Sequence, residues 1–263
     1  MRIVIPMAGQ SRRFAAAGYK TPKPFILIDG KPMIERVCRM FSASDEFIFI
    51  CSEDHLRNND YFNILKKSAV HSKIIGIKEH ELGPVHSILS VKNSFADVEE
   101  PILITYCDFL MQWDYRQFVF KAQNHDGAMA VFKGFHPASF GNTNYAYVRA
   151  NADFEMVEIR EKQSFTANRS EEYASTGIYF LDSYSTFEHY AKKLMANSMK
   201  VGAEYYCSLL YNPMVADGKK IALFEVQKFI CLGTPEDLHE YRFWSEYYAN
   251  HANAIALKEL IHD

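Results

Sequence analysis

Four cations gather around a short, glycine-containing loop near the start of the chain. Residues 7–14 (MAGQSRRF) directly follow a five-residue apolar strand predicted at 2–6. A strand that ends in small residues leaves backbone N–H groups unpaired, and these can point at an anion held beyond the strand. The loop therefore predicts a triphosphate cradle; the alternative is an ordinary strand-to-helix turn with a solvated basic face. The four cations are Arg12, Arg13, Lys20 and Lys23.

A carboxylate follows a second predicted strand. Asp108 comes directly after the apolar run 101–107. In an open α/β sheet, ligands bind beyond the carboxyl ends of the strands, where this carboxylate would lie beside the phosphate loop. Mg²⁺ prefers one or two carboxylates together with phosphate oxygens and water, so Asp108 is the predicted metal ligand. The alternative is an N-cap of the next helix, a position for which Asp114 is better placed.

Composition limits the class of protein. The 263 residues are 48% hydrophobic and 23% charged, which suits one large globular domain. The net charge of -3 provides no positive field for a nucleic acid backbone. No apolar run reaches the length of a signal peptide core or a membrane span. Five widely spaced cysteines without a C-x-x-C pair fit neither a disulfide framework nor a zinc site. We expect a soluble, cytoplasmic protein with mostly buried thiols.

The predicted elements alternate in the first half of the chain, which favours βαβ units and a parallel sheet. Strands are predicted at 2–6, 46–51, 73–77 and 101–107, and helices at 32–41, 54–67 and 84–95. The second half predicts a mixed sheet. Its strands are predicted at 128–132, 146–150, 156–160, 176–181, 221–226 and 229–232, and its helices at 115–124, 183–197, 204–215 and 235–250.

Other phosphate-binding motifs are absent from the sequence. The loop has neither G-x-x-x-x-G-K-[ST] nor G-x-G-x-x-G, so kinase and dehydrogenase interpretations lose their main support. Instead, seven strings in one order, spread over almost the whole chain, resemble the sugar-phosphate nucleotidyltransferase family. Within that family the sequence is similar to nucleotidyltransferases of bacterial capsule gene clusters, one branch of which are CTP:phosphoglutamine cytidylyltransferases. The strings are 7–14, 22–26, 30–35, 106–108, 161–162, 176–179 and 233–238.

The resemblance implies a reaction in which an acceptor phosphate oxygen attacks the α-phosphorus of a nucleoside triphosphate and displaces pyrophosphate. Catalysis would come from alignment and from cations placed where charge develops, without a nucleophilic side chain. The resemblance assigns Arg13 to the β- and γ-phosphates and Lys23 to the α-phosphoryl group and leaving oxygen. The rest of the triphosphate cradle would be Met7, Ala8, Gly9, Gln10, Ser11 and Arg12.

The acceptor is expected to bind to the second half of the chain. The resemblance assigns the acceptor's phosphate to Lys162, whose alternative role is that of a solvated residue at a strand end of alternating charge. Asn142 and Asn144 offer uncharged polar groups, although their surroundings are also typical of a hairpin turn. The implied acceptor-binding residues are Lys162, Glu161, Asn144, Thr176 and Gly177.

The chain departs from the family pattern at two positions. Ser11 replaces the second glycine of the common Gly-x-Gly-Ser/Thr-Arg loop, which puts the shape of the loop in doubt. Cys231 stands where many members carry an aspartate as a second metal ligand, and a thiol is a poor ligand for a hard cation. Glu204 is the predicted replacement ligand; its alternative role is a first-turn helix glutamate favoured by the macrodipole.

The choice of base is predicted from Glu81, which stands where the family has a glutamine that reads a pyrimidine. An ionised carboxylate only accepts hydrogen bonds, so it suits the amino group of cytosine and repels the carbonyl of uracil or thymine. Gly83 would allow the base to approach closely. The alternatives are that Glu81 accepts from guanine or faces solvent.

Together these observations predict an α/β protein with a Rossmann-like, mixed, mainly parallel sheet flanked by helices and a small acceptor-binding β subdomain. A single domain over 1–263 would comprise a nucleotide-binding half (1–125) and an acceptor-binding half (126–263). The expected activity is Mg²⁺-dependent transfer of CMP from CTP to a sugar phosphate or a phosphoglutamine-like acceptor, for capsule or surface polysaccharide synthesis. We expect no nucleic acid or membrane partner and allow for a homo-oligomer. The alternatives are a non-catalytic nucleotide sensor and a metal-dependent glycosyltransferase, although the latter's Asp-x-Asp is absent after 101–107.

Overall fold

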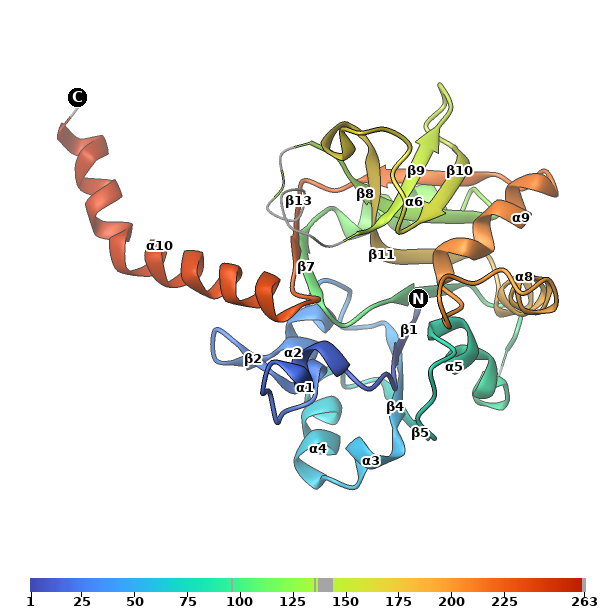
Figure 1. Cartoon of the computed structure of the whole chain (residues 1–263), viewed down its shortest axis with the longest axis horizontal. Coiled ribbons are helices and arrows are strands. Elements are labelled where there is room, and N and C mark those ends of the chain that lie inside the picture. Colours follow the sequence, from blue (N-terminus) through green and yellow to red (C-terminus); the bar gives the residue numbers. More distant parts are fainter. Residues whose placement is uncertain (96, 135, 137–143, 262–263) are drawn as a thin grey trace.

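One nine-stranded sheet runs through both halves of the chain. Figure 1 shows the computed structural model, which describes residues 1–95, 97–134, 136 and 144–261. The strands are hydrogen-bonded in the order β10-β9-β11-β6-β1-β4-β5, while β8 pairs with β11 and β12 pairs with β8. The strands are β1 (Arg2–Met7), β4 (Glu46–Ser52), β5 (Ser72–Ile77), β6 (Ile102–Thr105), β8 (Gly127–Phe132), β9 (Ala146–Ala150), β10 (Met156–Glu161), β11 (Tyr173–Leu181) and β12 (Ile221–Glu225).

The sheet is parallel from β5 through β4 and β1 to β6, and β11 then joins β6 in the antiparallel direction. The predicted α/β class with a mixed sheet is confirmed. Because β1 and β6 are parallel neighbours, the loop after β1 and Asp108 after β6 lie at the same edge of the sheet.

Both faces of β1 are buried, as its nearly continuous apolar sequence requires. Ile3 and Ile5 belong to a core that α2, α4 and α6 complete, whereas Val4 belongs to a second core shared with α5, α8 and α9. The helices are α1 (Arg12–Ala16), α2 (Met33–Cys38), α3 (Glu53–Leu56), α4 (Asn59–Ser68), α5 (Pro84–Ser90), α6 (Tyr115–Ala122), α8 (Tyr184–Ala196), α9 (Tyr211–Ala216) and α10 (Pro235–Ile261). The short 3₁₀ helices are η1 (Lys23–Phe25), η2 (Lys92–Ser94), η3 (Arg169–Glu171) and η4 (Cys207–Leu210).

Two small two-stranded sheets were not expected from the sequence, although the strand predicted at 229–232 corresponds to one of their strands, β13. β2 (Leu27–Ile28) pairs with β3 (Lys31–Pro32), and β7 (Phe109–Gln112) pairs with β13 (Lys228–Cys231). Just beyond this pair, Leu232 follows β13 and Asp108 precedes β7. The Leu232 N–H donates a hydrogen bond to the Asp108 carbonyl over 2.8 Å. The start of α10, far along the sequence, is thereby held beside Asp108.

The predicted helix 204–215 is wrong at its start. The Tyr205 N–H donates to the Leu82 carbonyl over 2.9 Å, and the Val85 N–H donates to the Tyr205 carbonyl over 3.2 Å. These long-range bonds keep Glu204 and Tyr205 out of a helix, so helical structure begins only at Cys207. Glu204 is therefore not a first-turn helix residue.

Other boundaries differ for local reasons. The predicted helix 54–67 is divided at Asn58, whose side chain accepts a hydrogen bond from the Asp60 N–H over 2.9 Å and so caps α4. The predicted strand 101–107 ends at Thr105, and the predicted helix 235–250 continues to Ile261. Asp114 caps α6, as the sequence indicated.

Four of the five cysteines are buried, as expected, and Cys231 is half-buried. All five are free thiols. Of the helices in the described part of the chain, none combines the length and the apolarity that crossing a bilayer requires.

Candidate active site

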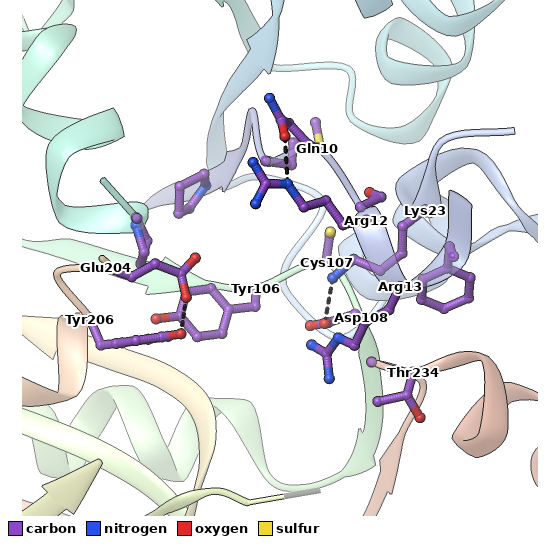
Figure 2. Close-up of a pocket in the computed structure, with 18 of the residues that line it drawn as sticks. Gln10, Arg12, Arg13, Lys23, Tyr106, Cys107, Asp108, Glu204, Tyr206 and Thr234 are labelled. Atoms are coloured by element: carbon purple, nitrogen blue, oxygen red, sulfur yellow. Dashed lines mark hydrogen bonds and ion pairs between the residues drawn. The ribbon is translucent and has the colours of Figure 1, made fainter. Parts of the chain in front are cut away.

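A cavity of about 1190 Å³ lies at the carboxyl ends of β1 and β6 (Figure 2). Residues from both halves of the chain line it, which brings together most of the site residues predicted from sequence. These are Met7, Ala8, Gly9, Gln10, Ser11, Arg12, Arg13, Lys23, Glu81, Gly83, Asp108, Asn144, Lys162 and Glu204.

The loop after β1 forms one wall of the cavity. Met7 and Ala8 are buried, whereas Gly9 and Gln10 are exposed. No atom lies within 4 Å of the position that a Cβ on Gly9 would occupy, beyond its chain neighbours, so the backbone here is open to a ligand. Ser11 has a φ of 48°, in the left-handed region that glycine favours. This backbone conformation is one that the glycine expected here from the family resemblance would adopt without strain.

Lys23 and Asp108 form an ion pair at the centre of the cavity. Lys23 Nζ donates to Asp108 Oδ2 over 2.7 Å, and each side chain is 21% exposed. Burial alone would lower the pKa of Lys23, but the adjacent Asp108 charge and hydrogen bond outweigh it and raise the pKa above its ordinary value. Lys23 therefore remains an ammonium ion at neutral pH. Arg13 lies beside this pair, so two cations surround Asp108 (Figure 2).

Arg12 connects two loops across the cavity. Its Nε donates to Gln10 Oε1 over 2.8 Å, and one of its two terminal guanidinium nitrogens pairs with the Glu81 carboxylate. Both charged side chains are exposed, so the pair adds little to the stability of the fold. Its effect is local, because it neutralises Glu81 and holds that carboxylate near the cradle loop.

Gly83 joins the loop of Glu81 to the segment that carries Glu204. It has a φ of 82°, and a Cβ there would lie 2.9 Å from both the Tyr205 nitrogen and Glu204 Cβ. Only glycine fits this close contact between backbones. Gly83 thus fixes the distance between two walls of the cavity, in addition to any contact with a ligand.

Lys162 lies on the wall opposite the cradle loop. Its Nζ donates to the Tyr206 hydroxyl and lies 3.9 Å from Glu204 Oε2, while Tyr206 donates to Glu204. The φ of Lys162 is 57°, and its N–H donates to the Tyr145 carbonyl over 3.0 Å. Figure 2 shows Glu204 and Tyr206 across the cavity from Asp108.

Three residues predicted to bind the acceptor are not among those that line the cavity. Thr176 is buried and donates to the Ala130 carbonyl, and Gly177 lies against the ring of Tyr106, which does line the cavity. Glu161 accepts a 2.6 Å hydrogen bond from Ser208, and burial raises its pKa. These three residues therefore do not face the cavity directly. Asn142 lies outside the described residues, and Lys20 is exposed away from the residues that line the cavity.

The carboxylate of Asp108 suits a hard cation that takes most of its other ligands from a substrate and from water. Within the described residues, no three His, Cys, Asp or Glu side chains are placed to hold a metal together. Mg²⁺ with phosphate oxygens and water needs only one or two carboxylates. Cys231 does not fit that role, because burial raises the pKa of its thiol to about 12 and it therefore stays protonated. Instead, the Cys231 thiol donates to Asp237 Oδ2 over 3.3 Å.

Asp237 is a carboxylate that the sequence analysis missed. It lines the cavity with Asp108 and Thr234, and the β7–β13 pair holds this segment beside Asp108. The Asp237 N–H donates to Thr234 Oγ1 and the Thr234 N–H donates to Asp237 Oδ2, each over 3.1 Å. This reciprocal pair is a capping box, and the spacing Thr-x-x-Asp at the start of the predicted helix 235–250 was its sequence signal.

The fold and the cavity define an α/β protein whose site, at the carboxyl ends of parallel strands, combines several cations with carboxylates. The chain belongs to the Nucleotidyl transferase family, which residues 3–241 match.

Similar proteins agree with this assignment. The bifunctional protein GlmU of Rhizobium etli is 25% identical over 250 residues, which make up 92% of this chain and 52% of that protein. The chain therefore spans about half the length of this relative.

Two solved structures share the fold. A nucleoside-diphosphate-sugar pyrophosphorylase from Vibrio cholerae has a TM-score of 0.74 and 21% identity, over 91% of this chain and 98% of that one. The inositol-1-phosphate CTP transferase from T. maritima has a TM-score of 0.68 and 16% identity, over 94% of this chain and 96% of that one.

The backbone at Ser11 generates a testable prediction. Ser11→Gly is expected to preserve triphosphate affinity, whereas Ser11→Val should lower the free energy of unfolding by about 1–2 kcal/mol, because a branched side chain is strained in the left-handed region. Denaturant unfolding and calorimetric titration with a nucleoside triphosphate measure these effects. Ser44→Val is the control at an exposed serine. Equal losses of stability at the two serines would contradict this explanation.

Proposed function

We propose that this chain transfers a nucleoside monophosphate from a nucleoside triphosphate to a small phosphorylated acceptor and releases pyrophosphate. The observation that carries the proposal is that three cations and a fourth line opposite walls of one cavity. Arg12, Arg13 and Lys23 come from the first half, and Lys162 comes from the second. Two phosphorylated ligands can therefore meet between them.

The cations divide between the two ligands of the proposed reaction. Arg13 and Lys23 would neutralise the charge that accumulates on the triphosphate and on the leaving pyrophosphate. Lys162 would hold the acceptor's phosphate so that its oxygen is in line with the α-phosphorus. No covalent intermediate is needed. Cys107, the buried thiol at this site, is not suited to form one because burial raises its pKa to about 12.

We propose Mg²⁺ as the cofactor, held by Asp108 with Asp237 as the second carboxylate. When bound, the ion would neutralise phosphate charge and align the triphosphate. In the structure, Lys23 pairs with Asp108. Phosphate oxygens of a bound triphosphate would replace Asp108 as the partner of the Lys23 ammonium group, which would leave the Asp108 carboxylate available to Mg²⁺. Glu204 is less suited to this role, because it lies across the cavity with Tyr206 and Lys162.

We favour CTP as the nucleotide because Glu81 lines the cavity beside the cradle loop. A carboxylate accepts from the amino group of cytosine and repels a carbonyl at the same position. The T. maritima neighbour is described as a CTP transferase, which supports this choice. Before the nucleotide binds, the pairing with Arg12 holds the Glu81 carboxylate beside the cradle loop.

For the acceptor we propose a sugar phosphate or a phosphorylated amino acid such as phosphoglutamine, used in making a capsule or surface polysaccharide. Hydroxyl and amide groups of such an acceptor could bond with Asn144, Glu204 and Tyr206, which line the cavity around Lys162. A cytoplasmic location suits the five free thiols.

The activity is tested by measuring pyrophosphate release with four ribonucleoside triphosphates and a panel of phosphorylated acceptors. We expect turnover with one pair, and Asp108→Asn or Lys23→Met should lower kcat by about a hundredfold or more, because each removes a preorganised charge. Asp126→Asn, in an ion pair with Lys219 outside the cavity, is the matched control. Tight triphosphate binding without turnover for any pair would instead identify a nucleotide sensor.

Base selection is tested with Glu81→Gln. The amide can donate to the carbonyl of uracil, so the ratio of kcat/KM for CTP to that for UTP should fall by about tenfold or more. Glu79→Gln is the control in the same loop, because Glu79 does not line the cavity. An unchanged ratio in Glu81→Gln would show that this carboxylate does not read the base.

The second carboxylate is tested with two variants of neighbouring residues. Asp237→Asn keeps the capping hydrogen bonds but loses the charge, so the Mg²⁺ concentration for half-maximal rate should rise by about tenfold or more. Cys231→Ser should leave that concentration unchanged, because a protonated thiol is no ligand. The reverse result, with Cys231→Ser the more sensitive variant, would refute the role of Asp237.

A further inference from the structure

The loop that carries Glu81 is attached to its surroundings on both sides of that residue. It spans residues 78–83, between β5 and α5, and Glu81 is exposed. The next residue, Leu82, has both of its backbone polar groups bonded. Its N–H donates to His80 Nδ1 over 3.1 Å, and its carbonyl accepts from the Tyr205 N–H over 2.9 Å. His80 and Leu82 therefore hold the backbone on either side of Glu81.

The second ring nitrogen of His80 faces helix α5. His80 Nε2 lies 3.0 Å from Ser87 Oγ, and Ser87 Oγ donates to the Gly83 carbonyl over 3.4 Å. Ser87 is buried, and both His80 and Ser87 line the cavity. The His80 ring therefore connects the loop of Glu81 to a buried side chain of the helix that follows it.

These hydrogen bonds require one arrangement of the protons on His80. A backbone N–H can only donate, so Nδ1 must be unprotonated to accept from Leu82. The neutral ring then carries its proton on Nε2, which donates to Ser87 Oγ, while the Ser87 hydroxyl donates to the Gly83 carbonyl. A charged imidazolium would instead set two donors, Nδ1–H and the Leu82 N–H, against each other. The contacts are therefore satisfied by the neutral ring in this tautomer.

We propose that His80, neutral and with its proton on Nε2, is a positioning residue that holds Glu81 where its carboxylate selects the base. His80 acts through the backbone of the loop, because Leu82 and Ser87 engage its two ring nitrogens. This role of His80 rests on the proposed choice of CTP by Glu81. Loss of the contact with Leu82 should weaken discrimination between bases more than affinity for the triphosphate, which the cradle loop would bind.

The surroundings of His80 favour the neutral ring. Burial lowers its pKa, and His86 of α5 lowers that pKa further, because the two rings lie edge to face with centroids 4.6 Å apart. The two carboxylates of the loop have other partners, since Glu79 accepts from a serine of β4 and Glu81 is paired across the cavity. The remaining charged residue of the loop, Lys78, is exposed. The ring is thus neutral at pH 7 and loses its backbone contact only as the pH falls through this lowered pKa.

The tautomer is tested by NMR spectroscopy of the full chain labelled with ¹⁵N at histidine. Correlations between the carbon-bound ring protons and the ring nitrogens distinguish a protonated nitrogen from an unprotonated one. The His80 signals are those that disappear in His80→Asn. We expect the His80 proton on Nε2 at about pH 7.5. A proton on Nδ1 at that pH would overturn the proposal, and this readout needs neither nucleotide nor turnover.

Base selection is tested by calorimetric titration with CTP and with UTP, which also needs no turnover. His80→Phe keeps a ring but offers Leu82 no acceptor. The preference for CTP, taken as the ratio of the two dissociation constants, should therefore fall by about three- to tenfold, the effect of one hydrogen bond. His80→Asn should restore most of it, because its amide oxygen can accept from Leu82. His86→Phe is the matched control, since His86 does not line the cavity.

A parallel titration of Glu81→Gln separates failure of the His80 role from failure of the proposed base reading. If Glu81→Gln lowers the preference for CTP and His80→Phe does not, His80 has no positioning role. If neither variant lowers it, the proposed reading of the base by Glu81 fails, and this role of His80 fails with it.

The pH dependence of the preference is a readout that a purely structural role would not change. As the pH falls from about 7.5 to about 5, His80 becomes protonated, so the preference of the wild-type chain for CTP should decline more steeply than that of His80→Asn, whose amide does not titrate. The ionisation of the triphosphate and of the carboxylates is common to both proteins and cancels in the comparison. Equal declines in the two proteins would overturn the proposal.

Discussion

The ion pair between Lys23 and Asp108 is the interaction on which the arrangement of the cavity depends. It joins the segment after α1 to the end of β6 over 2.7 Å, where both side chains are largely buried. Removing Asp108 would leave the largely buried Lys23 ammonium ion without its carboxylate partner, which is destabilising. Asp108 also accepts the Leu232 N–H through its carbonyl, so three distant segments meet at one residue. The cradle loop and the start of α10 are both positioned relative to this point.

The residues that follow strands could be predicted from sequence, whereas those placed by long-range pairing could not. Gly9 and Asp108 each follow a recognisable apolar run, and parallel strands bring their carboxyl ends to one edge. Glu204 was expected in a helix because nothing in its local pattern shows that Tyr205 bonds to the loop of Leu82. Asp237 was missed as a site residue because its place beside Asp108 depends on the pairing of β7 with β13.

The two departures from the family pattern have different physical consequences. Ser11 keeps the backbone conformation that glycine usually supplies, so the loop retains its shape at a cost in strain. Cys231 changes the chemistry, because a protonated thiol donates to a carboxylate and cannot serve as a hard ligand. The carboxylate it contacts is Asp237. The carboxylate that Cys231 contacts thus lies six residues further along the chain, in the first turn of α10.

Three cations of the cavity are paired with carboxylates from other segments. Arg12 pairs with Glu81, Lys23 with Asp108, and Lys162 with Glu204. Each pair satisfies a cation that, under the proposed function, would contact a phosphate group. Phosphate oxygens would then replace the carboxylates, which become free to bind other groups: Asp108 a divalent cation, Glu81 the base and Glu204 the donors of an acceptor. Binding of the two substrates would in this way exchange internal ion pairs for external ones. The internal pairs orient all three cations before either ligand arrives, and the Lys23–Asp108 pair is in addition largely buried.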